Sequence, residues 1–218
     1  MKAVVFVDVQ NDFIDGSLGV DKDHTISERI ADYAEKLRNA EAKTIMVATR
    51  DTHFTTKQIE ATREKSVEDF TEEDFNSISK SAYNETLEGE KLPVEHCIYG
   101  TKGWEIYPRL DKNILMPNKI NKITFGSLIP CCQDEDNLID NLCEYEYALS
   151  KFGDEITEIE LVGFCTSICV ISNALLLRAA FPNTKISILE NLCGDINKES
   201  HEAALRVAQN CQIDIKTV

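Results

Sequence analysis

The stretch Lys2-Ala-Val-Val-Phe-Val-Asp8 places a run of β-branched and apolar residues near the start of the chain and ends it with an acidic residue. Such a run is typical of a strand buried on both faces of a sheet. Apolar residues at helical spacing follow over 26–40, and a second apolar run covers 43–49. This succession of strand, helix and strand predicts parallel pairing of the two strands.

The same alternation continues through most of the 218 residues. It predicts further strands at 113–116, 119–125, 158–163, 185–189 and 212–218, and helices at 135–152, 166–181 and 198–210. We therefore expect an α/β fold: a single doubly wound, Rossmann-like domain over 1–218, with a mostly parallel sheet of about six strands and helices on both faces. A charged segment at about 54–87 breaks the pattern and predicts an inserted surface segment, either a lid or a solvated loop without a role.

Charge and composition exclude several classes of partner. The chain has 23 Lys and Arg against 38 Asp and Glu, a net charge of −15, which argues against nucleic acid and anionic membranes. The residues before the first expected strand do not resemble a signal peptide, and no apolar run approaches the roughly 20 residues of a membrane helix. We expect a cytoplasmic protein, in which the eight cysteines do not form a disulfide framework.

Chemically useful side chains follow the ends of several expected strands. They are Asp8 after the first strand, Asp51 and His53 after the second, Cys165 and Cys169 after 158–163, and Asp195 after 185–189. Because ligands bind outside the carboxyl ends of strands in open parallel sheets, this edge is the candidate site.

Two of these residues suit nucleophilic chemistry. Cys169 falls in the first turn of the helix expected from Thr166, where free N–H groups and a partial positive charge favour a thiolate and can receive an oxyanion. Asp8 suits a general base. Position alone leaves the alternatives open, because Cys169 also fits a buried structural cysteine and Asp8 also fits a cap of the following turn.

A carboxylate and an imidazole two residues apart, Asp51 and His53, resemble part of a metal site that would need a third ligand. His96 lies in a loop punctuated by Pro and Gly, while His24 and His201 are the remaining histidines. Two histidines and one carboxylate suit Zn, Fe or Mn. The spacing alone is a weak indication.

Five blocks of sequence together resemble the isochorismatase-like cysteine hydrolases, which include the nicotinamidases. In order they are Val7-Asp-Val-Gln-Asn-Asp-Phe13, Ala48-Thr-Arg-Asp-Thr-His53, His96-Cys-Ile-Tyr-Gly-Thr-Lys-Gly-Trp104, Lys122-Ile-Thr-Phe-Gly-Ser-Leu128 and Gly163-Phe-Cys-Thr-Ser-Ile-Cys-Val170. Each block is moderately specific, and their common order over most of the chain makes the resemblance strong.

The resemblance implies a catalytic triad of Asp8, Lys122 and Cys169. Lys119 competes for the lysine role, but the Phe-Gly-Ser-Leu that follows favours Lys122. The resemblance also implies a cis peptide before Cys165, with the N–H groups of Cys165 and Cys169 forming an oxyanion hole.

The family's metal set implies that Asp51, His53 and His96 hold a divalent metal, with Zn as first choice and Fe or Mn as alternatives. The implied activity is metal-assisted hydrolysis of a small amide through a thioester, with nicotinamide going to nicotinate plus ammonia. Family members are often homo-oligomers, so we expect one here.

The substrate is less firmly indicated than the nucleophile. Phe13, Trp104 and Phe125 are candidates for stacking on a substrate ring, although each also fits the core. Ile168 stands where the family often has an aromatic residue, and Ser167 where it often has Asp. Another small amide, a ureide or a carbamoyl compound therefore remains an alternative, as does a thiol-redox or non-catalytic metal-binding protein.

Overall fold

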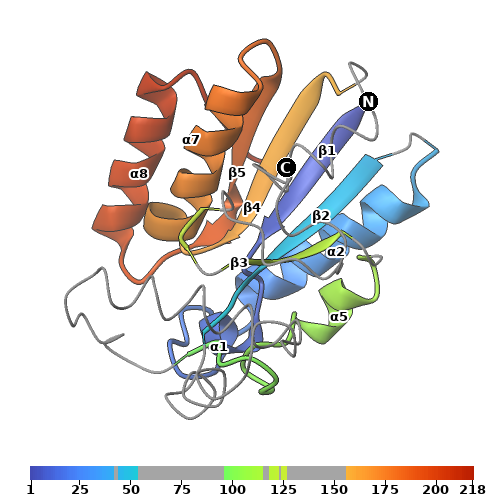
Figure 1. The fold of residues 1–218 in the computed structure, drawn as a ribbon, viewed down its shortest axis with the longest axis vertical. Helices are drawn as coiled ribbons and strands as arrows, with labels where there is room; N and C mark the ends of the chain where they lie inside the picture. The colour runs from blue at the N-terminus through green and yellow to red at the C-terminus, as the bar shows by residue number, and fades with distance from the viewer. Residues whose placement is uncertain (42–43, 54–95, 115–117, 123, 127–155) are drawn as a thin grey trace, which may run out of the picture.

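Six parallel strands form the sheet of the computed structural model, which describes residues 1–41, 44–53, 96–114, 118–122, 124–126 and 156–218 (Figure 1). The order across the sheet is β3-β2-β1-β4-β5-β6. Their bounds are β1 Lys2–Val7, β2 Thr44–Asp51, β3 Lys119–Lys122, β4 Glu158–Phe164, β5 Lys185–Gly194 and β6 Asp214–Lys216. The chain builds outward from β1 to β3, returns to place β4 beside β1, and builds outward again. The expected doubly wound sheet is confirmed, and its direction reverses between β1 and β4.

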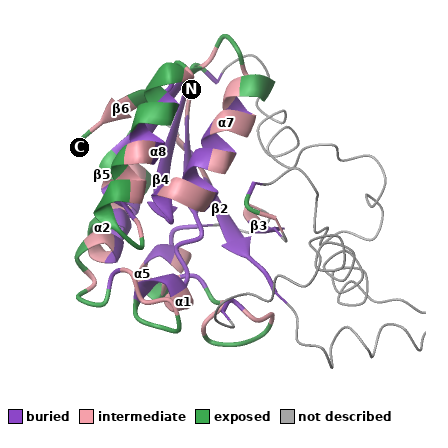
Figure 2. Cartoon of the chain, turned by 90° about the vertical axis from the view of Figure 1, so that its left-hand side faces the viewer, coloured by how far each residue is buried: buried purple, intermediate pink, exposed green. Residues whose placement is uncertain are grey.

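Helices cover both faces of this sheet, as expected. The helical elements are α1 Asn11–Ile14, α2 Thr25–Asn39, α5 Pro108–Asp111, η3 Thr166–Val170, α7 Ile171–Ala180 and α8 Lys198–Asn210. The pair α7 and α8 packs on one face, and α2 with α5 on the other. Figure 2 shows that the central strands are buried, whereas β6 at the edge of the sheet is partly exposed.

The central strand β1 explains why both faces need cover. Its side chains alternate between the faces, and every residue from Ala3 to Val7 is fully buried. Val5 belongs to the core that contains Leu177 of α7, whereas Phe6 belongs to the core that contains Ile30 of α2. The continuous apolar run at 3–7 thus supplies two cores from one strand.

Several strand bounds differ from expectation. β2 runs past 49 to Asp51, β3 ends at Lys122 instead of 125, and β6 is confined to Asp214–Lys216 instead of 212–218. β5 continues past 189 to Gly194, because its pairing with β4 resumes beyond a bulge even though Glu190 and Asn191 interrupt its apolar pattern. Of the expected strand at 113–116, Asn113 instead lies in a turn after α5, and Ile114 belongs to neither a helix nor a strand. The expected helix at 135–152 and the expected insertion at 54–87 lie outside the described residues.

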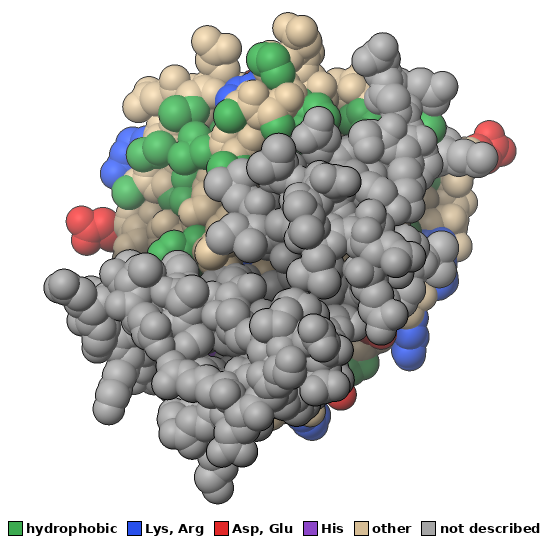
Figure 3. All heavy atoms as spheres, in the orientation of Figure 1, with side chains coloured by type: hydrophobic (Ala, Val, Ile, Leu, Met, Phe, Trp, Pro, Cys, Tyr) green, Lys and Arg blue, Asp and Glu red, His purple; other side chains and the backbone are tan. Residues whose placement is uncertain are grey.

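The outer surface is mixed. In the orientation of Figure 1, apolar side chains gather over α7 and α8, with charged side chains around the edge of the view (Figure 3).

Within the residues that the structure describes, no helix combines the length and the apolar character needed to cross a membrane.

Candidate active site

The carboxyl ends of four adjacent strands carry the expected site residues. Asp8 follows β1, Asp51 and Lys122 are the last residues of β2 and β3, and Cys165 follows β4. Asp51 and Lys122 are direct partners in the β2–β3 register. The site therefore lies where the winding of the sheet reverses, the usual position of ligand sites in such folds.

A buried cluster joins Asp8, Lys122 and Cys169. Lys122 Nζ lies 2.7 Å from Asp8 Oδ2 and 3.5 Å from Cys169 Sγ. The side chains of Asp8 and Lys122 are fully buried. Thr49 holds the other carboxylate oxygen of Asp8 by donating its hydroxyl to Oδ1 at 2.7 Å. By contrast, Lys119 pairs with Asp111.

Burial and neighbouring charges shift the pKa values of this cluster in opposing directions. Burial raises the pKa of the Cys169 thiol well above its ordinary value, and the Lys122 charge only partly opposes this. Burial likewise raises the pKa of Asp8 against the opposing charge of Lys122. Burial acts to lower the pKa of Lys122, but the charges of Asp51 and Asp8 outweigh it and hold that pKa well above its usual range. Burial thus acts against the thiolate that the helical position of Cys169 was expected to favour, and the charge of Lys122 acts for it.

The turn that carries Cys169 is held at its start by side chains from β5 and α8. The Phe164–Cys165 peptide is cis, as expected. A wide turn follows, in which Val170 N–H donates to Cys165 O at 3.0 Å. Asp195, directly after β5, accepts from the Ser167 N–H at 2.5 Å and from the Ser167 hydroxyl at 3.0 Å. His201 Nδ1 lies 2.8 Å from Thr166 Oγ1.

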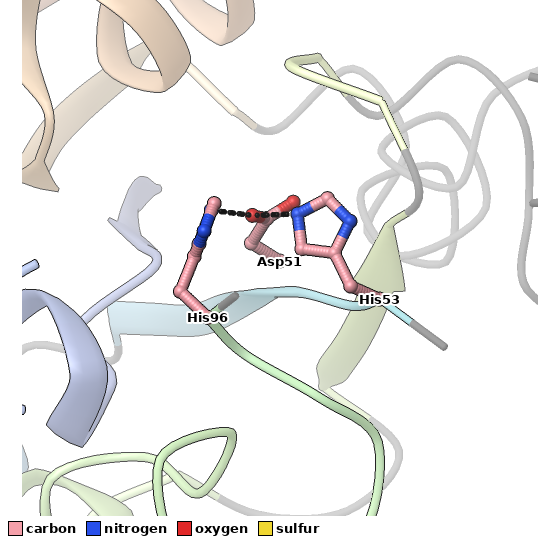
Figure 4. Close-up of side chains that lie close together, drawn as sticks. All are labelled: Asp51, His53 and His96. Atoms are coloured by element: carbon pink, nitrogen blue, oxygen red, sulfur yellow. Dashed lines mark hydrogen bonds and ion pairs between the residues drawn. The ribbon is translucent and has the colours of Figure 1, made fainter. Parts of the chain in front are cut away.

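Asp51, His53 and His96 converge beside this cluster (Figure 4). One potential ligand atom from each lies within 4.8 Å of the others, and all three residues are buried. Asp51 Oδ2 is 2.8 Å from His53 Nε2 and 3.4 Å from His96 Nε2. Two imidazoles and one carboxylate at this spacing fit a divalent transition metal. Asp51 Oδ1 also lies 3.3 Å from Lys122 Nζ, so the possible metal site and the cysteine cluster share a neighbour.

The three aromatic candidates occupy different environments. Phe13 is buried and meets the His96 ring edge-on, with 5.6 Å between the ring centroids. Trp104 stacks on the Arg50 guanidinium, which lies 4.1 Å from the centre of its ring. Phe125 is 56% exposed. Of these candidates, Phe13 thus has a described contact with an expected metal ligand.

Three polar residues that the sequence reasoning did not single out belong to the surroundings of the site. Thr49 orients Asp8, while Gln10 and Asp12 bind the main chain of neighbouring segments. The available signal was that polar side chains stand in or beside apolar strands, where burial demands hydrogen-bond partners.

A buried carboxylate, lysine and cysteine lie beside a possible metal site at the reversal point of a doubly wound sheet, the arrangement that the resemblance to the isochorismatase-like hydrolases implied. The model of the isochorismatase domain matches residues 2–218, and the chain belongs to the isochorismatase family of hydrolases. No curated protein matches the sequence.

Solved structures share the fold at low sequence identity. A nicotinamidase/pyrazinamidase from Bacillus subtilis is 23% identical, with 99% of each chain covered and a TM-score of 0.66. A pyrazinamidase from Pyrococcus horikoshii in complex with zinc is 21% identical, covering 100% of this chain and 99% of that one, with a TM-score of 0.64. An N-carbamoylsarcosine amidase from Thermoplasma acidophilum is 15% identical, covering 99% and 95%, with a TM-score of 0.61.

Proposed function

We propose that this chain is a metal-assisted cysteine amidase that converts nicotinamide to nicotinate and ammonia. The observation that carries the proposal is the position of Lys122 Nζ, 2.7 Å from the Asp8 carboxylate, 3.5 Å from the Cys169 sulfur and 3.3 Å from Asp51 of the possible metal set. This arrangement supports a nucleophile, a base and a substrate anchor acting in one place.

The acylation half begins with transfer of the Cys169 thiol proton to Asp8, whose raised pKa makes it a better base than an exposed carboxylate. The sulfur then attacks the amide carbonyl carbon, and the N–H groups of Cys165 and Cys169 receive the oxyanion. The fixed charge of Lys122 stabilises the thiolate as it forms. Asp8 returns the proton to the departing nitrogen, ammonia leaves, and a thioester remains on Cys169.

The deacylation half uses the same groups in reverse. Asp8 takes a proton from a water molecule, whose oxygen attacks the thioester carbonyl. The C–S bond breaks, the carboxylic acid leaves, and Cys169 recovers its proton. No group outside the cluster is needed for the proton balance of either half.

Asp51, His53 and His96 would hold the metal, for which zinc is our first choice and iron and manganese are alternatives. Bound there, the ion would supply a Lewis-acid anchor for a pyridine nitrogen. The contact of Phe13 with the His96 ring supports a flat aromatic substrate beside these residues.

A second substrate class is kept because of Ile168, which is partly buried against both cores and offers no aromatic face beside Cys169. Small amides, ureides or carbamoyl compounds without a ring suit such a site. The cytoplasmic location and the homo-oligomer remain predictions.

The test is ammonia release from nicotinamide by the full chain, measured after chelation and again after adding Zn²⁺, Mn²⁺ or Fe²⁺. We expect metal-dependent release that falls at least about 1,000-fold in Cys169→Ala. Cys193→Ala is the matched control, because Cys193 is also a buried free cysteine but lies in β5. Absence of release with every metal would refute nicotinamide as substrate, and full activity of Cys169→Ala would refute the nucleophile.

A further inference from the structure

The Gln10 side chain pairs with the main chain of Asp51 from both of its ends. Gln10 is fully buried, its Nε2 donates to Asp51 O at 2.9 Å, and its Oε1 accepts from the Asp51 N–H at 2.7 Å. The same Nε2 donates to Trp104 O at 2.8 Å. An amide that bonds both the N–H and the C=O of one residue imitates a neighbouring strand. Gln10 therefore fixes the end of β2 at a point where the described β1–β2 pairing has already ended.

Two positions later, Asp12 holds the segment that carries His96. Its Oδ2 accepts from the N–H of Cys97, the residue after His96, at 2.7 Å. Cys97 O in turn accepts from the His53 N–H at 2.9 Å. By holding Cys97, Asp12 therefore also helps to position the segment that carries His53. A Cβ on Gly103 would lie 2.1 Å from Asp12 Oδ2, so the loop approaches this carboxylate as closely as glycine allows.

We propose that Gln10 and Asp12 are positioning residues that set the relative placement of the metal ligands. Gln10 holds Asp51, and Asp12 holds the His96 segment and, through Cys97, the His53 segment. The turn that directly follows Asp8 thereby joins the base of the triad to the metal set. The proposal rests on the proposed function only in taking Asp51, His53 and His96 as the ligands.

The consequence is a specific effect on metal affinity. Residues that orient metal ligands typically contribute 10- to 100-fold to affinity, because small displacements spoil the coordination geometry. Gln10 and Asp12 act on the main chain of the ligand segments, so their loss lets those segments shift while the ligand side chains remain intact. We expect Gln10→Met and Asp12→Ala each to weaken Zn²⁺ binding by about 10-fold or more.

Asn11 offers a matched control on the same turn. Its Nδ2 donates to Lys102 O at 2.7 Å, which is the same kind of contact from side chain to main chain but is made to a residue that is not next to a ligand. Asn11→Ala should keep the Zn²⁺ affinity of the parent chain. Asp12→Asn should recover most of the affinity lost in Asp12→Ala, because an amide oxygen can still accept from Cys97.

The experiment is a competition titration of the metal-free full chain with Zn²⁺ against a chromophoric chelator, followed by the absorption spectrum with Co²⁺ as a probe of ligand geometry. Weakened affinity and an altered Co²⁺ spectrum in Gln10→Met and Asp12→Ala, with Asn11→Ala and Asp12→Asn close to the parent, are the expected results. If Gln10→Met does not fold, the two Asp12 variants decide the matter on their own.

Three results would overturn the proposal: equal affinity in all variants, an equal loss in Asn11→Ala, or no Zn²⁺ binding by the parent chain. A parent chain that binds Zn²⁺ but releases no ammonia from any amide would refute the proposed function and leave this inference standing. The experiment can therefore refute the proposed function without refuting the positioning roles of Gln10 and Asp12.

Discussion

Removing the Lys122 charge tests the electrostatics of the site most sharply. Its Nζ lies 3.5 Å from Cys169 Sγ in a fully buried environment. At an effective dielectric constant of about 20, a unit charge at that distance stabilises a thiolate by about 4 to 5 kcal/mol, or about three pKa units. In Lys122→Met the pKa of Cys169 should rise further, since burial already raises it and the opposing charge is lost. Part of the effect will be offset as Asp8 and Asp51 take up protons.

The assay is the rate of Cys169 alkylation by iodoacetamide between pH 6 and 10, followed by mass spectrometry of the peptide that contains it. Below the thiol pKa this rate follows the thiolate fraction, so we expect a fall of at least about 100-fold at neutral pH. Lys119→Met is the matched control, because Lys119 lies on the same strand and pairs with Asp111 instead. Its alkylation profile should match that of the parent chain.

Stability gives a second readout of the same change. Leaving buried carboxylates without their cation costs about 3 to 5 kcal/mol in the free energy of unfolding, measured by urea titration. An alkylation profile of Lys122→Met that matches the parent chain, or an equal fall in Lys119→Met, would refute the reasoning.

Three further changes have defined outcomes. Gly163 has φ +129°, and a Cβ added there would lie 1.9 Å from Val7 O. Gly163→Ala should therefore lower the free energy of unfolding, measured by urea titration, by about 3 kcal/mol. An unchanged midpoint of the urea titration would contradict this. Burial raises the pKa of Cys193 to about 12 in the folded chain. Between pH 9 and 12 the unfolded chain therefore releases this proton while the folded chain keeps it. The free energy of unfolding should fall by about 1.4 kcal/mol per pH unit over this range. Cys193→Ala should show a correspondingly shallower slope of unfolding free energy against pH, and equal slopes would count against the burial argument. Asp195→Asn weakens the hold on Ser167 at the start of the nucleophile turn, so kcat should fall about 10- to 100-fold with little change in KM; an unaltered kcat would exclude a positioning role.

Sequence pattern predicted the sheet because its strands carry apolar runs that serve two cores. The run at 3–7 is the clearest case, since every residue in it is fully buried. The end of β5 was missed because Glu190 and Asn191 break its apolar pattern, while main-chain pairing with β4, which sequence does not display, carries the strand on to Gly194.

The candidate site was predictable to the extent that it lies at strand ends. Asp8, Asp51 and Lys122 all fall there, and parallel pairing brings them together. The roles of Gln10 and Asp12 were not predictable, because their partners are main-chain atoms more than 40 residues away. The helical position of Cys169 was expected to favour its thiolate, whereas burial, which the sequence does not display, raises the pKa of this thiol.

The most direct test of the central claim is to trap the acyl group on Cys169. The chain would be mixed with nicotinamide, quenched in acid within one turnover and digested, and the peptide containing Cys169 weighed by mass spectrometry. We predict a peptide heavier by one nicotinoyl group that disappears on longer incubation and does not accumulate within the same time in Lys122→Met at neutral pH. Ammonia release without any acylated Cys169 peptide, or acylation at another cysteine, would contradict the account.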